Sequence, residues 1–342
     1  MPFVYAGPDR WTNASQQDIA LGAWRAVVIA FSLFSFVCVT PAGAADKLLS
    51  VGTSSKSGVY YPVGQALCDA VNAGRDQHLR RCLAYNTGGS IYNINALVSG
   101  ETDISITKAD LADDAYRGEI LFSAHGPNKN LRMIANLYGE PVTVIVHKDS
   151  SINSFSELLG KRINIGNRGS GKRSTATNIL KIMGWNIGQF AEIHELPTGA
   201  MGEAFCAGKI DVLIESMGIP SKFYDFITSQ CGARFLPLPE KVIAGFKKLS
   251  AAFYSTEIKG GLYPQNPDSV STVGMKVVLV TTNKISNESI AVVARALLSE
   301  KSHFRHWHPS LTNSTPVFMT DTQGVPMHDG ALSYYRKMKL LP

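Results

Sequence analysis

The feature that most constrains the fold is an alternation of short β-branched runs with helix-length segments along the chain. The runs expected as strands are 48–52, 103–106, 132–137, 142–147, 162–166, 211–214 and 274–281. After the first run, Val63, Ala66, Leu67, Ala70 and Val71 recur at helical spacing and form one apolar stripe. Strand–helix alternation of this kind predicts mostly parallel sheets covered by helices, which is the α/β class.

The N-terminal segment resembles an export signal. Residues 26–40 form an apolar run that follows Arg25. At about 15 residues it is shorter than the roughly 20 that a membrane-spanning helix needs. Ala42 and Ala44 then supply the small side chains of an A-x-A cleavage site. We therefore expect a signal peptide at 1–44 and a periplasmic protein; the alternative is an uncleaved membrane anchor.

Cysteine usage agrees with export. Apart from Cys38 in the apolar run, the chain has Cys68, Cys82, Cys206 and Cys231, an even number that predicts disulfides. Four cysteines allow three pairings, and sequence order favours the local ones, 68 with 82 and 206 with 231. The alternative, a metal site, lacks C-x-x-C spacing, so we expect no metal.

Three loops rich in glycine and hydroxyl residues each lead into a predicted helix. They span 52–62, 87–90 and 166–173. Glycines let the backbone approach a ligand, and a helix start offers free N–H groups with a partial positive charge. Such loops gather at the carboxyl ends of strands, where they bind anions. The alternative is that they are ordinary turns, which use the same residues.

The third loop, GNRGSGKR, nearly matches the nucleotide-binding P-loop. The P-loop needs a hydroxyl after its lysine to hold Mg²⁺, and here that position is Arg173. A planar guanidinium instead suits a carboxylate, which it can bind through two parallel hydrogen bonds. The alternative is that Arg173 faces solvent at a helix start.

Several strings together resemble one family: GTSSKSGVYYPVG, CLAYNTGGSIYNINAL, INIGNRGSGKR, GLYPQNPDSVSTVGMKVVLVTT and HDGALSYYRKMKL. In order and spacing they are similar to the TAXI family, the receptors of one class of tripartite ATP-independent periplasmic (TRAP) transporters. The resemblance implies a type II periplasmic-binding-protein fold with the ligand between two lobes. It also implies delivery to an integral-membrane partner energised by an ion gradient, with glutamate-like amino acids or small dicarboxylates as ligands.

The resemblance also implies which residues bind. The matching cleft positions are Thr53, Tyr60, Tyr61, Thr87, Gly88, Gly89, Ser90, Gly169, Ser170, Gly171, Arg173 and Tyr263. The family's paired cysteines match Cys68 and Cys82. Where the family has a Q-S-D string this chain has Lys108-Ala109-Asp110, and Lys172 stands where the family often has Thr. Two cations near the cleft favour a dicarboxylate or acidic amino acid; the alternative is that both lysines point to solvent.

We therefore expect lobe one to combine 45–147 with 273–342 and lobe two to span 148–272. The expected function is that of a monomeric solute-binding receptor, not an enzyme, with no cofactor. The sequence lacks a G-x-S-x-G nucleophile elbow, and its glycine loops lack paired carboxylates. The net charge of +6 comes from scattered residues, which favours a solvated surface over a nucleic-acid site. Competing hypotheses are a periplasmic sensory or scaffold domain on the same fold and a P-loop nucleotide-binding protein.

Overall fold

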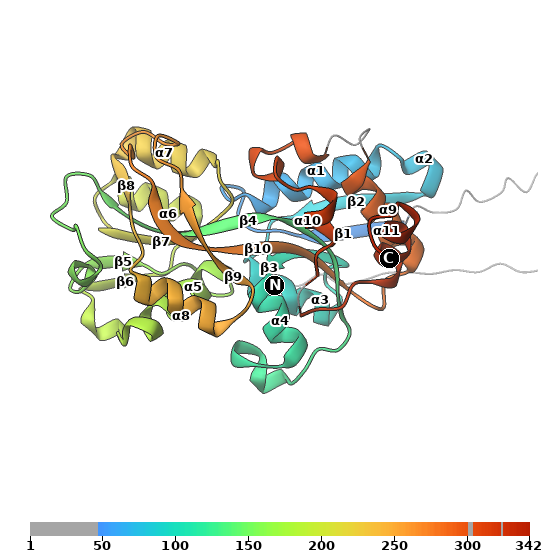
Figure 1. Ribbon diagram of the computed structural model, residues 1–342, viewed down its shortest axis with the longest axis horizontal. Coiled ribbons are helices and arrows are strands. Elements are labelled where there is room, and N and C mark those ends of the chain that lie inside the picture. The colour runs from blue at the N-terminus through green and yellow to red at the C-terminus, as the bar shows by residue number, and fades with distance from the viewer. Residues whose placement is uncertain (1–46, 300–303, 323) are drawn as a thin grey trace, which may run out of the picture. The chain divides into compact units, whose positions relative to one another are not determined.

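The computed structural model describes residues 47–299, 304–322 and 324–342 (Figure 1). The signal peptide expected at 1–44 lies outside the described residues. Within the described ranges, every helix is too short or too polar to cross a membrane.

Strands and helices alternate as the sequence predicts. The first half of the chain contains β1 (Lys47–Gly52), α1 (Tyr60–Asn72), α2 (Arg75–His78), β2 (Arg80–Tyr85), α3 (Ser90–Ser99), β3 (Ile104–Lys108), α4 (Ala109–Arg117), β4 (Leu131–His147), β5 (Arg162–Asn164) and α5 (Gly171–Met183). The second half contains β6 (Glu192–His194), α6 (Thr198–Cys206), β7 (Val212–Ser216), α7 (Lys222–Cys231), β8 (Ala233–Leu236), α8 (Glu240–Leu249), β9 (Phe253–Ile258), β10 (Val270–Thr282), α9 (Asn287–Leu298), α10 (Pro316–Thr320) and α11 (Asp329–Lys337). The α/β class is confirmed.

The strands form one sheet in the order β2-β1-β3-β10-β4-β7-β5-β6, with β8 beside β4 and β9 beside β10. The outer pairs β1–β2, β1–β3, β5–β6 and β5–β7 are parallel, as expected for strands joined by helices. Every pair that β4 or β10 makes is antiparallel. The sheet therefore consists of two parallel regions joined through two long antiparallel strands.

These two strands, β4 and β10, lie side by side along much of their length (Figure 1). Up to Pro141, β4 pairs with β10, and from Val142 it pairs with β7 and β8. The sequence predicts two separate strands in this stretch, 132–137 and 142–147, with Gly139 and Pro141 between them. That prediction of a break is wrong: β4 runs unbroken through Gly139, where a Cβ atom would collide with the hydroxyl of Tyr254.

The apolar residues pack on both faces of the sheet. Of the predicted stripe in α1, Val63, Ala66, Leu67 and Val71 are buried against β1 and the C-terminal helices. A second cluster of buried residues joins the later part of β4 to β5, β7, α5 and α8. Neither cluster covers the carboxyl ends of the parallel strands, where loops with polar side chains lie instead.

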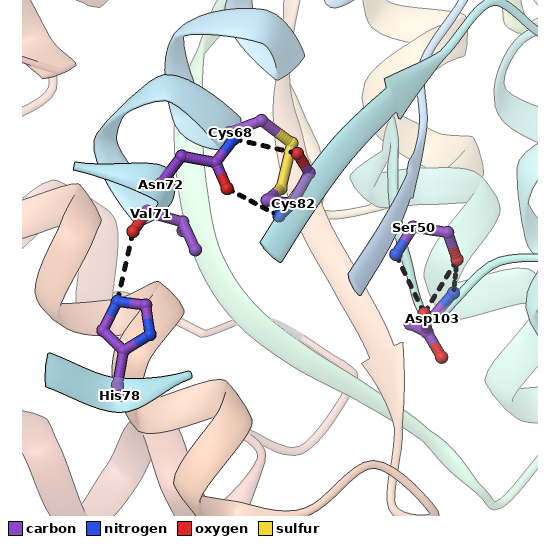
Figure 2. Close-up of a disulfide and its surroundings, with 7 residues drawn as sticks. All are labelled: Ser50, Cys68, Val71, Asn72, His78, Cys82 and Asp103. Carbon is purple, nitrogen blue, oxygen red and sulfur yellow. Dashed lines mark hydrogen bonds between the residues drawn. A yellow bond between two sulfur atoms is a disulfide. The ribbon is translucent and has the colours of Figure 1, made fainter. Parts of the chain in front are cut away.

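Both locally paired disulfides are present, Cys68–Cys82 and Cys206–Cys231, with Cα atoms 4.8 and 4.9 Å apart. The first ties α1 to the edge strand β2 (Figure 2). There the side-chain amide of Asn72 donates to the Cys82 carbonyl at 3.0 Å and its oxygen accepts from the Cys82 N–H at 2.8 Å. Asn72 thus satisfies backbone groups that have no neighbouring strand on that side.

Replacing Cys68 and Cys82 together by alanine is expected to lower the free energy of unfolding by about 3 kcal/mol. The disulfide closes a loop with a sequence separation of 14, so its loss gives the unfolded chain more freedom. Urea denaturation of the double variant measures the change. The matched control removes Cys206 and Cys231, whose separation of 25 predicts a slightly larger loss. Equal stability of the first variant and the unmodified protein would contradict the prediction.

Candidate functional site

The three glycine loops lie around one cavity of about 70 Å³. This volume exceeds the roughly 10–15 Å³ that one water molecule needs, so several atoms of a ligand fit. The loops bring the starts of α1, α3 and α5 to the cavity, and the start of α6 joins them. The lining residues are Ser54, Ser55, Gly58, Val59, Tyr60, Thr87, Gly88, Gly89, Ser90, Lys108, Glu140, Asn167, Ser170, Gly171, Lys172, Pro197, Thr198, Glu215, Ser216 and Met217.

Local sequence explains how two of these helices begin at the cavity. Gly89 precedes α3 with φ +102°, a conformation that favours glycine. Ser170 caps α5, and its hydroxyl accepts a hydrogen bond from the Arg173 N–H at 3.3 Å. A Cβ atom on Gly89 would lie 3.4 Å from the Cα atom of Ser170, so the two helix starts are close neighbours.

The second and third loops contact each other directly. The Gly169 carbonyl accepts from the N–H groups of Ile91 and Tyr92 at 3.0 and 3.1 Å. The side chain of Asn167 donates to the Gly88 carbonyl at 3.1 Å. Two of the N–H groups at the start of α3 are therefore used for the contact between the loops. The starts of the other helices supply more of the N–H groups that face the cavity.

The two lysines are buried and paired, so the alternative that they point to solvent is wrong. The Lys108 side chain is 2% exposed, and its ammonium lies 3.7 Å from Oε1 of Glu140. It also donates to the Gly171 carbonyl at 3.1 Å and to the Thr175 hydroxyl at 2.5 Å. These contacts join the end of β3 to the first turn of α5.

Lys172 makes a second buried pair. Its ammonium lies 2.6 Å from Oε2 of Glu215 and also donates to the Thr198 hydroxyl. The other Glu215 oxygen accepts from the Ser216 N–H at 2.9 Å, and Thr198 donates to Oε2 at 3.0 Å. The expectation that the lysines add positive charge for a ligand is therefore corrected, because each already faces a carboxylate.

The two carboxylates, Glu140 and Glu215, are the main functional candidates that sequence reasoning missed. They lie in strands, away from the glycine loops in which the sequence predicts the binding groups. A signal exists: each glutamate stands alone within or at the end of an apolar run, in YGEPVTVIV and VLIES. A glutamate in a buried strand requires a partner, and the two lysines in the loops are suitable ones.

Burial also changes the acidity of these groups. Removal from water raises the pKa of Glu140 to about 8; the ammonium of Lys108 opposes this, and the nearby Glu215 adds to it. Burial raises the pKa of the Tyr60 hydroxyl, which lies 3.3 Å from the Ser90 hydroxyl. The floor of the cavity thus disfavours negative charge at Glu140.

Five of the predicted binding residues do not line this cavity. Thr53 is fully buried and donates to the Tyr85 carbonyl, and Gly169 supports α3 through its carbonyl. The Tyr61 hydroxyl accepts from Gln65. Tyr263 packs among aromatic rings and accepts from the Ser221 N–H, beside a larger cavity of about 790 Å³.

Arg173, the fifth, does not reach the cavity either. Its guanidinium forms an ion pair with Glu195 at 2.5 Å, and the Arg173 side chain is 29% exposed. The predicted carboxylate partner of Arg173 is therefore a residue of the chain itself. The remaining eight predicted residues, Tyr60, Thr87, Gly88, Gly89, Ser90, Lys108, Ser170 and Gly171, line the cavity together.

Other chemistries find little support in the described ranges. Within them, no three His, Cys, Asp or Glu side chains come close enough to hold a metal ion. In a P-loop the lysine reaches the nucleotide phosphates, whereas Lys172 is held by Glu215 and Thr198.

The sheet and the cavity at its strand ends define an α/β protein with the periplasmic-binding-protein fold. A solved structure from Bordetella bronchiseptica RB50 shares this fold with a TM-score of 0.52 at 11% identity, covering 85% of this chain and 98% of that one. MatC from Rhodopseudomonas palustris with bound malate has a TM-score of 0.50 at 12% identity, covering 75% and 86%. The alkanesulfonate-binding protein SsuA from Xanthomonas axonopodis pv. citri has a TM-score of 0.45 at 14% identity, covering 87% and 86%.

The family is shown by a match of the amino-acid sequence to a family model. The model of the NMT1-like family matches residues 51–338, so the chain belongs to that family. The TAXI resemblance is finer than this assignment and stays a prediction.

Proposed function

We propose that this protein is an exported solute-binding receptor that captures a small carboxylate in the cavity between two lobes. The observation that carries the proposal is the convergence of four helix starts on one cavity, α1 and α3 from 45–147 and α5 and α6 from 148–272. Helix starts leave N–H groups without partners inside the helix and carry partial positive charge, so together they suit a carboxylate. The MatC structure holds malate on a fold of this kind.

In this proposal β4 and β10 connect lobe one, 45–147 with 273–342, to lobe two, 148–272. Both strands change partners along their length, which suits a bend at that point. A ligand held by both lobes favours the closed arrangement, because it contacts both sides only there. The contacts of Gly169 and Asn167 with the second loop then act as a latch that closes over the ligand.

In this proposal the ligand is passed on unchanged to an integral-membrane partner, and the TAXI resemblance supports a TRAP transporter driven by an ion gradient as that partner. Two features favour binding without chemistry. The lining residues include no His or Cys in the part of the chain that is described, and each lysine is paired with a glutamate. A receptor of this kind works in the periplasm, in agreement with the predicted signal peptide and the two disulfides.

A thermal-shift screen tests this function. A small carboxylate at about 100 times its dissociation constant stabilises the native state by roughly 2.7 kcal/mol. For a mature chain of about 300 residues that corresponds to a rise of about 4 °C in melting temperature. We expect such a rise with at least one amino acid, monocarboxylate or dicarboxylate.

The control is a matched pair in α3. Ser90→Ala changes a cavity residue, whereas Ser99→Ala changes an exposed residue in the last turn of the same helix. Ligand-induced stabilisation should weaken in the first variant and persist in the second. A rise with ATP and with no carboxylate would refute the receptor function and favour the nucleotide-binding alternative.

A further inference from the structure

The four charged side chains of the cavity are not equally satisfied. Both oxygens of Glu215 accept hydrogen bonds, from Lys172, Thr198 and Ser216. Among the described residues, Oε1 of Glu140 is buried without a hydrogen bond that meets the distance and angle of a normal one, and the Ser216 hydroxyl, which lies near this carboxyl and lowers its pKa, is also buried without a partner. A buried carboxylate oxygen without a donor costs free energy, so this atom has a strong tendency to bind a donor.

Lys108 cannot serve Oε1 well from its present position. An ammonium has three N–H donors, and Lys108 directs donors at Gly171 and Thr175 of α5. Its nitrogen lies 3.7 Å from Oε1, which is beyond hydrogen-bond distance. Lys108 therefore lies close enough to compensate a negative charge on Glu140, but Oε1 of Glu140 can still accept a hydrogen bond from another group.

The charges of the residues that line the cavity also favour a ligand that brings a hydrogen-bond donor to Glu140. Two glutamates and two lysines face the cavity, so their formal charges cancel when all four are ionised. The carboxylate of a ligand with one such group can bind at the helix starts. A second carboxylate has no donor to offer Oε1 of Glu140 and would keep this carboxyl in its protonated form, whereas a protonated amine donates to Oε1 and favours the ionised form.

We propose that Glu140 is the specificity-determining residue of this site and selects a monocarboxylate that also carries a protonated amine over a dicarboxylate. The amine donates to Oε1 of Glu140 while the ligand's carboxylate faces the helix starts. This inference rests on the proposed function, since it assigns the ligand class of the same cavity. It replaces the dicarboxylate preference that the two lysines suggested when only the sequence was considered.

Isothermal titration calorimetry with paired probes tests the inference on the full mature chain. The aminomonocarboxylates are glycine, L-alanine and 4-aminobutanoate, and the dicarboxylates are malonate and succinate. We expect at least one aminomonocarboxylate to bind at least tenfold more tightly than the dicarboxylate of similar length. In Glu140→Gln, which keeps the shape but cannot ionise to pair with a ligand ammonium, that preference should fall at least tenfold, while Glu240→Gln, at an exposed glutamate in α8, should keep it.

A proton count provides a readout that a purely structural role would not change. Because burial raises the pKa of Glu140 to about 8, this carboxyl is largely protonated at pH 7. An ammonium at Oε1 favours the ionised form, so binding should release up to one proton per ligand. Titrations in buffers of different ionisation enthalpy measure this release, which should vanish in Glu140→Gln.

The possible results separate the two proposals. Tighter binding of a dicarboxylate by the unmodified protein, or an unchanged preference in Glu140→Gln, overturns the role of Glu140 and leaves the receptor function standing. Failure of every probe, together with no response in the wider carboxylate screen, overturns the receptor function itself. A cooperative thermal transition without ligand, together with a circular dichroism spectrum like that of the unmodified protein, shows that the variant is folded.

Discussion

Lys172→Met is expected to lower the free energy of unfolding by about 3–5 kcal/mol, because it leaves Glu215 buried without its cation. The side chains of Lys172 and Glu215 are only 8% and 2% exposed, so water cannot replace the lost partner. Methionine fills a similar volume, which limits the effect of an altered packing. Chemical denaturation at pH 7 measures the loss.

Two further variants show whether the loss comes from the unpaired charge. Lys172→Met combined with Glu215→Gln removes both charges and keeps an oxygen that accepts from Thr198, so it should recover at least half of the stability. Lys148→Met, in the exposed pair with Asp149, should cost less than about 1 kcal/mol. A loss below about 1 kcal/mol in the single variant would show that Glu215 does not depend on Lys172.

The helices and central strands could be predicted from the sequence because their signals are local. The apolar stripe of α1 is visible within a few residues of the sequence. Four strands, β2, β6, β8 and β9, were missed. β2 begins with two arginines and is an edge strand with exposed side chains, so it lacks a clear apolar pattern. The strand β6 has only three residues and none of them is fully buried.

In the site, too, the local features could be predicted from the sequence and the contacts between distant residues could not. The glycines and hydroxyls of the loops are local features, and eight of the predicted residues meet at the cavity. The ion pairs depend on contacts that are distant in sequence. Lys108 ends β3 and Glu140 lies in β4, with β10 between these strands in the sheet. The spacing of residues in the sequence does not show which strands are neighbours in the sheet. The sequence therefore predicts unpaired cations at both lysines.

Arg173 also has a partner that is distant in the sequence. A guanidinium at a helix start beside glycine loops has the chemistry of a carboxylate site, and the sequence supports that interpretation. The structure places Glu195 within reach, 22 positions later in the chain, just after the short strand β6. Because β6 was not recognised, the approach of Glu195 to the third loop was not expected.

Glu140 also predicts a pH dependence of stability. Its pKa is about 8 in the folded protein and 4.5 for an ordinary glutamate, chiefly because burial disfavours the charged form. Between these two values the unfolded chain has lost the proton that the folded protein still binds. The free energy of unfolding therefore falls as pH rises through this window, by about 1.4 kcal/mol per pH unit and several kcal/mol in total. Below about 4.5 and above about 8 this group adds no further change.

Glu140→Gln isolates this contribution because glutamine does not titrate. We expect the stability of the unmodified protein relative to Glu140→Gln to be highest near pH 5 and to fall steadily towards pH 8.5. Urea denaturation at intervals of half a pH unit, without carboxylate ligands, measures the difference, and Glu240→Gln at an exposed position should follow the unmodified protein. Parallel curves for Glu140→Gln and the unmodified protein would mean that Glu140 is already ionised at pH 5. The cavity would then hold a permanently charged carboxylate paired with Lys108, and a ligand amine would bind without releasing a proton.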